Sequence, residues 1–182
     1  MNAQHVQLES TRTADIDEPL RAAIVAMCTA AHGQDFRELF TRYLPPDGLH
    51  VIGRIGDRVV GHAVVTTRWL RYDHTRRMRT AYVDAVATAP DHQRRGIGRA
   101  VMRRVEELVT ENAYEIACLE TDRAGFYTRL GWETWHGSLA GLGQDGLVPT
   151  PDQTGIMILR LPSTPPLELD YALIIEIDGR IW

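Results

Sequence analysis

The stretch APDHQRRGIGRA, from Ala89 to Ala100, decides the fold class of this chain. It follows the largely apolar run 82–88 and precedes residues 96–111, whose apolar side chains recur at helical spacing. The first turn of a helix leaves N–H groups unpaired and carries a partial positive charge, so a pyrophosphate can bind there when no side chain blocks it. Gly96 and Gly98 leave that space open. The segment therefore predicts a phosphate-binding turn between a strand and a helix.

Other motifs that place glycines before a helix fit this segment less well. A P-loop would end in Gly-Lys followed by Ser or Thr, and a dinucleotide fingerprint would need a third glycine where Val101 stands. A plain strand-to-helix turn with solvated arginines is the simplest alternative. What remains is Gln93-x-x-Gly-x-Gly after a strand that ends Val86-x-x-x-Pro90. Positive charge at the same end comes from Arg94, Arg95 and Arg99.

This arrangement resembles the acetyl-CoA signature of the GNAT superfamily of acetyltransferases. The resemblance implies that the strand splays from its neighbour and binds the pantetheine arm through its backbone, while the loop N–H groups bind the pyrophosphate. We therefore expect acetyl-CoA as co-substrate, and we expect no metal ion because the histidines lack metal-ligand spacing. The expected binding residues are Val86, Ala87, Thr88, Gln93, Arg94, Arg95, Gly96, Ile97, Gly98, Arg99 and Ala100.

Length and periodicity predict one globular domain over residues 1–182, 44% hydrophobic and 24% charged. The element order predicts the α/β (α+β) class: a single-domain GNAT fold whose mixed, mostly antiparallel sheet has helices on both faces. Helices are expected at 18–31, 36–43, 96–111 and 122–130. Strands are expected at 5–9, 49–55, 58–71, 77–88, 114–120, 132–138, 155–161 and 169–176, with the Gly- and Pro-rich residues 140–151 as a loop.

Composition also limits location and partners. The net charge of −4 argues against nucleic acid, and no apolar stretch is long enough to span a bilayer. The N-terminus has no basic segment followed by an apolar run, and the two cysteines form no disulfide framework. We expect a cytoplasmic protein that binds neither membranes nor nucleic acid.

Five further stretches narrow the resemblance. They are Gln34-Asp35-Phe36, Tyr82-Val83-Asp84, the aromatic and glycine pattern of 127–137, Thr150-Pro151-Asp152, and the final Asp178-Gly179-Arg180-Ile181-Trp182. Together they are similar to the aminoglycoside 2′-N-acetyltransferases. The resemblance implies a small-molecule aminoglycoside substrate, a role in antibiotic resistance, and a homodimer.

The same resemblance implies two catalytic residues. A protonated amine cannot attack a thioester, so Asp84 would take the proton, directly or through water. Family members usually carry Glu there, and the shorter Asp makes a bridging water more favourable. Tyr127 would protonate the departing thiolate. The alternatives are an ordinary strand-edge carboxylate for Asp84 and a packed aromatic for Tyr127. A buried, otherwise apolar strand should not carry an unpaired acid, which favours a functional Asp84. With Phe126 beside Tyr127, the catalytic role is still favoured there.

The acceptor would be bound by acidic groups. Asp35, Asp152 and Asp178, with the terminal carboxylate of Trp182, can accept charge-assisted hydrogen bonds from an amino sugar, although turn or cap roles fit the first two equally well. The chain departs from the family at Phe40 and Arg180, where acids are common. The stretch from Glu120 to Gly125 is also shorter than is usual in the family. Fewer acids suit a less cationic acceptor, so the kasugamycin 2′-N-acetyltransferase branch is the narrower hypothesis.

Two rival functions stay open at this point. The chain could acetylate a protein amine, a polyamine, or typical cationic aminoglycosides such as gentamicin and tobramycin. It could also be a non-catalytic module that binds acyl-CoA or the drug. The acidic C-terminal part argues against a protein or polyamine acceptor, and Asp84 with Tyr127 argues against the binding module.

Overall fold

The computed structural model describes residues 5–182, which divide into two compact units. The first unit holds the chain up to Thr66 together with Val83–Leu108, and the second holds Thr67–Tyr82 together with Val109–Trp182. Strands β3 (Arg58–Tyr72) and β4 (Arg76–Thr88) run from one unit into the other. The predicted α/β class is confirmed, and the pairing is mixed and mostly antiparallel.

The first unit contains β1 (Gln7–Arg12), β2 (Leu49–Ile55), the first half of β3 and the second half of β4. β1 pairs with β2, and β2 pairs with the first half of β3, with a register shift at Gly53/Arg54. The apolar residues of β2 and β3 are almost fully buried, as expected for strands covered on both faces.

Helix α1 (Glu18–His32) begins and ends where its sequence predicts. The side chain of Asp17 accepts a hydrogen bond from the amide of Leu20 at 3.0 Å, and Pro19 lies in the first turn. Gly33 ends the helix in the left-handed conformation, with a φ of 67°.

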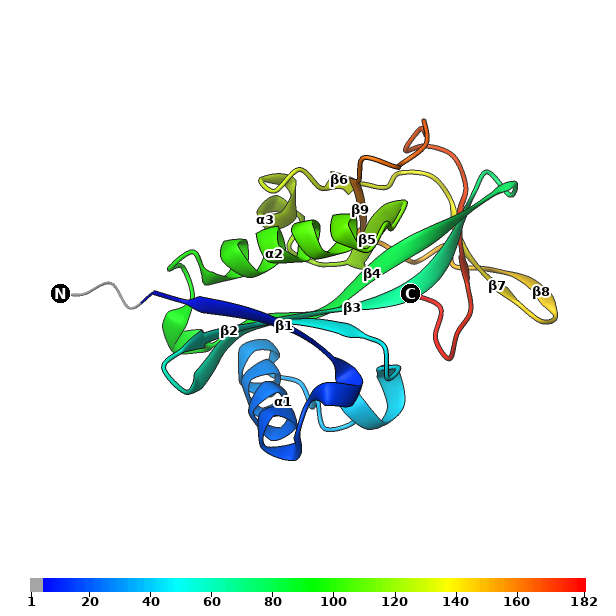
Figure 1. The fold of residues 1–182 in the computed structure, drawn as a ribbon. Coiled ribbons are helices and arrows are strands. Elements are labelled where there is room, and N and C mark those ends of the chain that lie inside the picture. The colour runs from blue at the N-terminus through cyan, green and yellow to red at the C-terminus, as the bar shows by residue number, and fades with distance from the viewer. Residues whose placement is uncertain (1–4) are drawn as a thin grey trace. The chain divides into compact units, whose positions relative to one another are not determined.

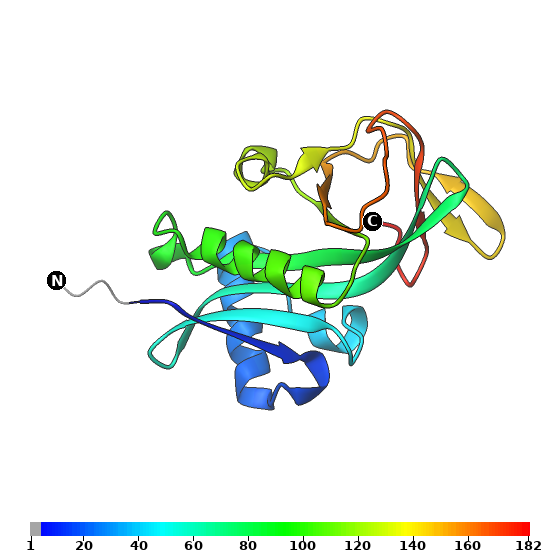
Figure 2. The same ribbon diagram turned by 45° about the horizontal axis from the view of Figure 1, so that its top comes forward.

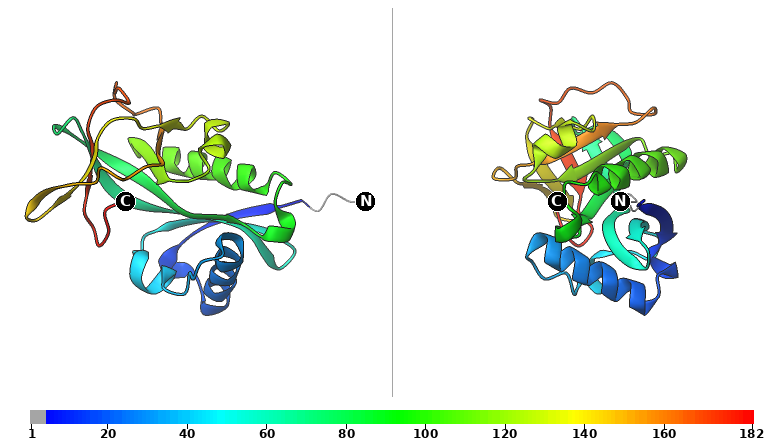
Figure 3. Two further views of the ribbon diagram at one scale, coloured as in Figure 1. Left: turned by 180° about the vertical axis from the view of Figure 1, so that it is seen from behind. Right: turned by 90° about the vertical axis from the view of Figure 1, so that its left-hand side faces the viewer.

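Helix α2 (Ile97–Glu111) lies on the opposite face of the first unit's strands from α1 (Figures 1 and 3). A Cβ atom at Gly61 of β3 would lie 2.8 Å from the side chain of Ile97. The neighbouring His62 instead faces Cys28 of α1, with Nδ1 3.8 Å from Sγ. Successive strand residues point to opposite faces, so the prediction of helices on both faces is confirmed for this unit.

The second unit carries a sheet in the order β6-β9-β5-β4-β3-β10-β7-β8. Two of its pairings are parallel, β4 with β5 and β10 with β7. Its core contains Trp135, Ile158 and Trp182. Its elements after β4 are β5 (Ile116–Glu120), α3 (Ala124–Thr128), β6 (Glu133–Thr134), β7 (Leu139–Gly143), β8 (Gly146–Pro149), β9 (Ile156–Arg160) and β10 (Leu173–Glu176).

The expected loop at 140–151 was the main error in the prediction. These residues form most of the β7–β8 hairpin (Figure 2), with Leu142 opposite Leu147 and Gly146 in the turn at a φ of 113°. Glycine and proline are poor strand residues. The strand forms because β7 pairs in parallel with β10, from Leu173 opposite Leu139.

Two expected helices are shorter than predicted. Residues 36–43 form a π-helical turn only at Leu39–Tyr43, before the two prolines at 45 and 46. The helix expected at 122–130 is reduced to α3, whose chain leaves through Gly131 at a φ of 87°. Within residues 5–182, no helix is both long and apolar enough to cross a bilayer.

Candidate active site

The turn between β4 and α2 has the geometry expected of a phosphate site. Arg94 and Gly96 both have positive φ angles, 61° and 83°, which turn the chain sharply into the helix. The amide of Ala100 donates to the carbonyl of Gly96 at 3.0 Å, the first bond of the helix. The N–H groups of residues 97–99 therefore precede the helical ladder and point out of its end. A Cβ atom at Gly96 would meet nothing within 4 Å, so the space above the turn is open.

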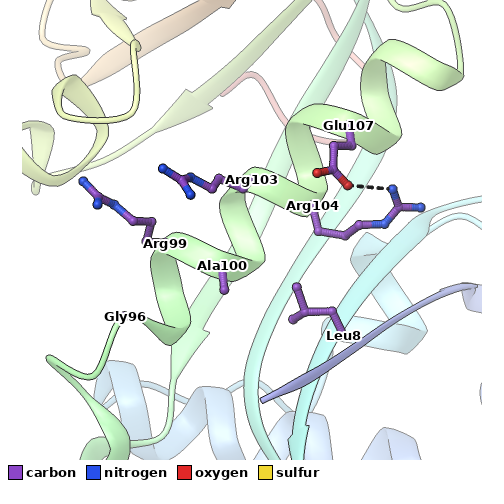
Figure 4. A pocket seen from close by; sticks show the side chains of 7 residues that line it. All are labelled: Leu8, Gly96, Arg99, Ala100, Arg103, Arg104 and Glu107. Atoms are coloured by element: carbon purple, nitrogen blue, oxygen red, sulfur yellow. Dashed lines mark hydrogen bonds and ion pairs between the residues drawn. The ribbon is translucent and has the colours of Figure 1, made fainter. Parts of the chain in front are cut away.

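A positively charged pocket of about 370 Å³ adjoins this turn (Figure 4). Arg99 and Arg103 extend from α2 together, whereas Arg104 lies on the side of Leu8 and is paired with Glu107 at 2.9 Å. Sequence reasoning missed four lining residues: Leu8, Arg103, Arg104 and Glu107. The helical spacing of Arg103 from Arg99 was an available signal.

Strand β4 extends beyond its pairing with β5. Its pairing with β5 covers only the residue pairs from Thr80↔Ile116 to Tyr82↔Cys118, and β4 continues to Thr88. Next to Asp84, Ala85 has a φ of 47°, a left-handed conformation that interrupts the strand's alternation. The family resemblance predicts that the pantetheine arm binds along this part of β4.

Some of the expected backbone partners already have hydrogen bonds. The carbonyl oxygen of Val86 lies 3.1 Å from Nε2 of His32, and the side chain of Gln93 donates to the carbonyl of Thr88 at 3.4 Å. A carbonyl oxygen has two lone pairs, so either contact can coexist with a ligand bond. The bond from Gln93 links the signature loop to the strand before it.

The two expected catalytic residues belong to different units. Asp84 is half-buried in the first unit, and Tyr127 is buried in the second. The Tyr127 ring packs edge-on against Phe126 and Trp132. Burial, with the nearby Asp122 carboxylate, raises the pKa of Tyr127 to about 12. The phenol therefore stays protonated at physiological pH, so it can donate a hydrogen bond or a proton but cannot serve as a base.

Hydrogen bonds from Arg68 to backbone carbonyls hold the C-terminal segment of the second unit in place. Nη2 of the buried Arg68 donates to the carbonyl of Arg180 at 2.7 Å and to that of Glu176 at 3.3 Å. The indole N–H of Trp182 donates to the hydroxyl of Thr150 at 3.1 Å, and the ring packs in the core. Arg180 lies with its guanidinium 5.4 Å from the centre of the Tyr82 ring.

The expected acidic residues differ in what they contact. Asp35 forms an exposed ion pair with Arg37 at 2.6 Å, which lowers the pKa of the carboxyl. Glu120 accepts a hydrogen bond from Gln153 at 2.9 Å. Asp152 and Asp178 are exposed, the latter in a tight turn bridged to Arg180.

Phe40, the remaining expected substrate residue, is stacked parallel to the ring of His50 with centroids 5.5 Å apart. It therefore packs against the first unit's core rather than standing free in solvent. Among residues 5–182, no group of three or more His, Cys, Asp or Glu side chains is arranged to hold a metal ion.

Comparisons with known proteins agree with this geometry. The acetyltransferase (GNAT) domain family matches residues 8–135. An aminoglycoside 2′-N-acetyltransferase of Mycolicibacterium fortuitum is 32% identical over 93% of this chain and 89% of its own length. The chain therefore belongs to the GNAT acetyltransferase family. It is an acetyl-CoA-dependent N-acetyltransferase.

Solved structures share the fold. A GCN5-related N-acetyltransferase from Kribbella flavida is 24% identical with a TM-score of 0.59, covering 75% of this chain and 35% of that one. Eis1 from Mycobacterium abscessus is 20% identical with a TM-score of 0.63, covering 75% of this chain and 33% of that one. The chain thus spans about a third of the length of these two proteins.

Proposed function

We propose that this enzyme transfers the acetyl group of acetyl-CoA to the 2′-amino group of an aminoglycoside antibiotic and thereby confers resistance. The observation that carries the proposal is the 32% identity to the M. fortuitum aminoglycoside 2′-N-acetyltransferase over nearly the whole chain. The open turn at Gly96 and the arginine-lined pocket support binding of the acetyl-CoA phosphates there. A cytoplasmic location and a homodimer remain predictions.

The proposed reaction is a direct attack in a ternary complex. The acceptor nitrogen bonds to the thioester carbon, the nitrogen proton passes to Asp84 directly or through water, and the C–S bond breaks. The departing CoA thiolate then gains a proton. Tyr127 meets it as a hydrogen-bond donor.

The raised pKa of Tyr127 refines its proposed role. A phenol with a pKa of about 12 is a weaker acid than a thiol with a pKa of about 8.5. Complete proton transfer from Tyr127 to the thiolate would therefore be uphill. We infer that the Tyr127 hydroxyl stabilises the thiolate by a charge-assisted hydrogen bond and that solvent completes protonation.

The charge of the proposed acceptor site favours kasugamycin as the aminoglycoside. Asp35 is already paired with Arg37, and Phe40 is apolar where members of the resembled family often carry an acid. Arg180 adds a cation in the C-terminal segment. Kasugamycin has one amino sugar and a carboxyl-amidine group, so it needs fewer acidic partners than gentamicin.

The deciding experiment measures release of CoA thiol from acetyl-CoA with kasugamycin, gentamicin, tobramycin and a peptide amine as separate acceptors. We expect release with kasugamycin and little with the others. Release with gentamicin and tobramycin would keep the aminoglycoside activity and overturn the specificity. Release of CoA thiol only with the peptide amine would overturn the proposal that the acceptor is an aminoglycoside. Binding of acetyl-CoA without thiol release in the presence of any acceptor would favour a non-catalytic module.

A further inference from the structure

Two buried histidines of the first unit form a hydrogen-bonded series that ends at the backbone next to Asp84. Nδ1 of His62 lies 2.9 Å from the carbonyl oxygen of Ala85, and Nε2 of His62 lies 2.9 Å from Nδ1 of His50. Nε2 of His50 in turn lies 3.0 Å from the hydroxyl of Thr13. Both imidazoles are fully buried, and neither is used by the chemistry described above.

The strand register explains why these side chains meet. His50 of β2 pairs with Val64 of β3, so His62, two residues before Val64, is its diagonal neighbour on the same face. Phe40 stacks on His50, and both histidine side chains are buried. The series is therefore a product of β2–β3 pairing and reaches across to β4.

The direction of the hydrogen bonds follows from the last acceptor. A carbonyl oxygen only accepts, so the proton lies on Nδ1 of His62 and its Nε2 is an acceptor. His50 must then donate from Nδ1, which leaves its Nε2 as an acceptor. The single proton of Thr13 is shared between this Nε2 at 3.0 Å and the more distant Gly48 carbonyl at 3.3 Å. Every polar atom of both rings is satisfied when both are neutral.

Burial keeps both rings neutral. It lowers the pKa of His50 to about 3, with a further contribution from His62, and it lowers the pKa of His62 to about 4. The series is therefore a fixed structural element near neutral pH rather than a proton carrier.

The carbonyl oxygen of Ala85, which is bound by His62, lies in the part of β4 where the regular strand conformation is interrupted. Ala85 has a φ of 47°, a conformation that residues with a Cβ atom adopt only when the surroundings hold it. Ala85 directly follows Asp84, and its carbonyl belongs to the peptide unit that it shares with Val86. The rotation at Ala85 joins that unit to the one shared with Asp84, so holding the carbonyl fixes the turn next to Asp84.

We propose that His62 is a positioning residue for acetyl transfer: its bond to the Ala85 carbonyl holds the left-handed turn that aims Asp84 at the acceptor amine. His50 and Thr13 act one step further away by fixing the ring orientation of His62. The proposal rests on the proposed role of Asp84 as base.

The test compares two replacements of His62 with opposite properties. In His62→Asn, the side-chain amide lies close to the former Nδ1 position and keeps a donor, but it fills less space. In His62→Leu, the apolar volume is filled and no donor remains. Positioning predicts that kcat falls about 10- to 100-fold in His62→Leu and largely recovers in His62→Asn. A packing role alone predicts that Leu is tolerated as well as Asn or better.

A double-variant cycle shows whether the effect passes through Asp84. His62→Leu should lower kcat strongly in the native background and hardly at all beside Asp84→Asn. Cys28→Ala is the matched control, because Cys28 lies against His62 and Ala85 without supplying a strong hydrogen bond. That variant should keep native kcat.

Amide hydrogen exchange provides a readout that needs no acceptor. Residues 84–87 should exchange faster in His62→Leu than in His62→Asn or Cys28→Ala. An Asn variant no better than Leu, an additive cycle, or unchanged exchange would overturn the proposal. Native kcat in Asp84→Asn alone would instead overturn the proposed base, and the exchange result would still report on the turn.

Discussion

Arg68 donates a hydrogen bond to the carbonyl oxygen of Arg180 at 2.7 Å, so one arginine holds the backbone of the other. The two guanidinium groups also lie near the Tyr82 ring, at 5.1 and 5.4 Å from its centre. Arg68 is buried and Arg180 is partly exposed. The first therefore acts on the structure of the C-terminal segment, and the second carries a charge that we propose influences what binds there.

Replacing Arg68 by Met should loosen this segment. The change keeps an apolar stem but removes a charged donor to two backbone carbonyls, which is worth about 1.5–3 kcal/mol. Urea unfolding should show that loss in the free energy of unfolding. The exposed Arg129→Met is the control and should differ from the native protein by less than about 0.5 kcal/mol. Equal stability of the two variants would contradict the anchoring role.

Reversing the charge at Arg180 should change the acceptor preference. In Arg180→Asp, a carboxylate replaces a cation, so kcat/KM for gentamicin should rise relative to that for kasugamycin by roughly tenfold, or about 1.4 kcal/mol. Arg180→Gln removes the charge without reversing it and should give a smaller shift in the same direction. An unchanged ratio of the two kcat/KM values would remove Arg180 from the account of specificity.

Removing the hydroxyl of Tyr127 should lower turnover without loss of acetyl-CoA binding. Tyr127→Phe keeps the ring packed against Phe126 and Trp132 but deletes the proposed donor to the thiolate. We expect kcat to fall by about 100-fold. Calorimetry with acetyl-CoA should give a Kd within a few-fold of the native value. A native kcat in this variant would exclude Tyr127 from the reaction.

Stability should fall as the pH is lowered from about 6.5 toward 4. His50 and His62 have folded-state pKa values of about 3 and 4, below the unfolded value of about 6.5. In that window the unfolded chain binds up to two more protons than the native state, so acid favours unfolding by up to about 2.7 kcal/mol per pH unit. Above pH 7 this contribution is constant.

Unfolding by urea at several pH values tests this dependence. His62→Asn should be less stable than the native protein at pH 7 but should lose less stability between pH 6.5 and 4.5, because one depressed histidine is gone. Carboxylates with lowered pKa values, such as Glu176, act below about pH 4.5 and do not explain a slope above it. Parallel slopes for the two proteins would contradict the buried neutral state of His62.

Several features follow from residues that are neighbours in the chain. Asp17 and Gly33 mark both ends of α1 because capping bonds span only a few residues. The glycines of 93–98 and the helix that follows them predict the turn expected to bind acetyl-CoA, because the bonds of a turn also join residues that are close in the chain. The catalytic and acceptor assignments at Asp84, Tyr127 and Asp178 came from family resemblance and remain predictions.

Other features depend on residues far apart in the chain. The β7–β8 hairpin was missed because its residues have weak strand propensity and are held by pairing with β10. No periodicity indicates that His50 and His62 would meet, or that His62 would reach Ala85. The sequence by itself determined the ends of α1 and the glycine turn before α2, since their bonds are local. Only the tertiary structure decided the histidine series and the Arg68–Arg180 contact, because strand register and chain packing bring those partners together.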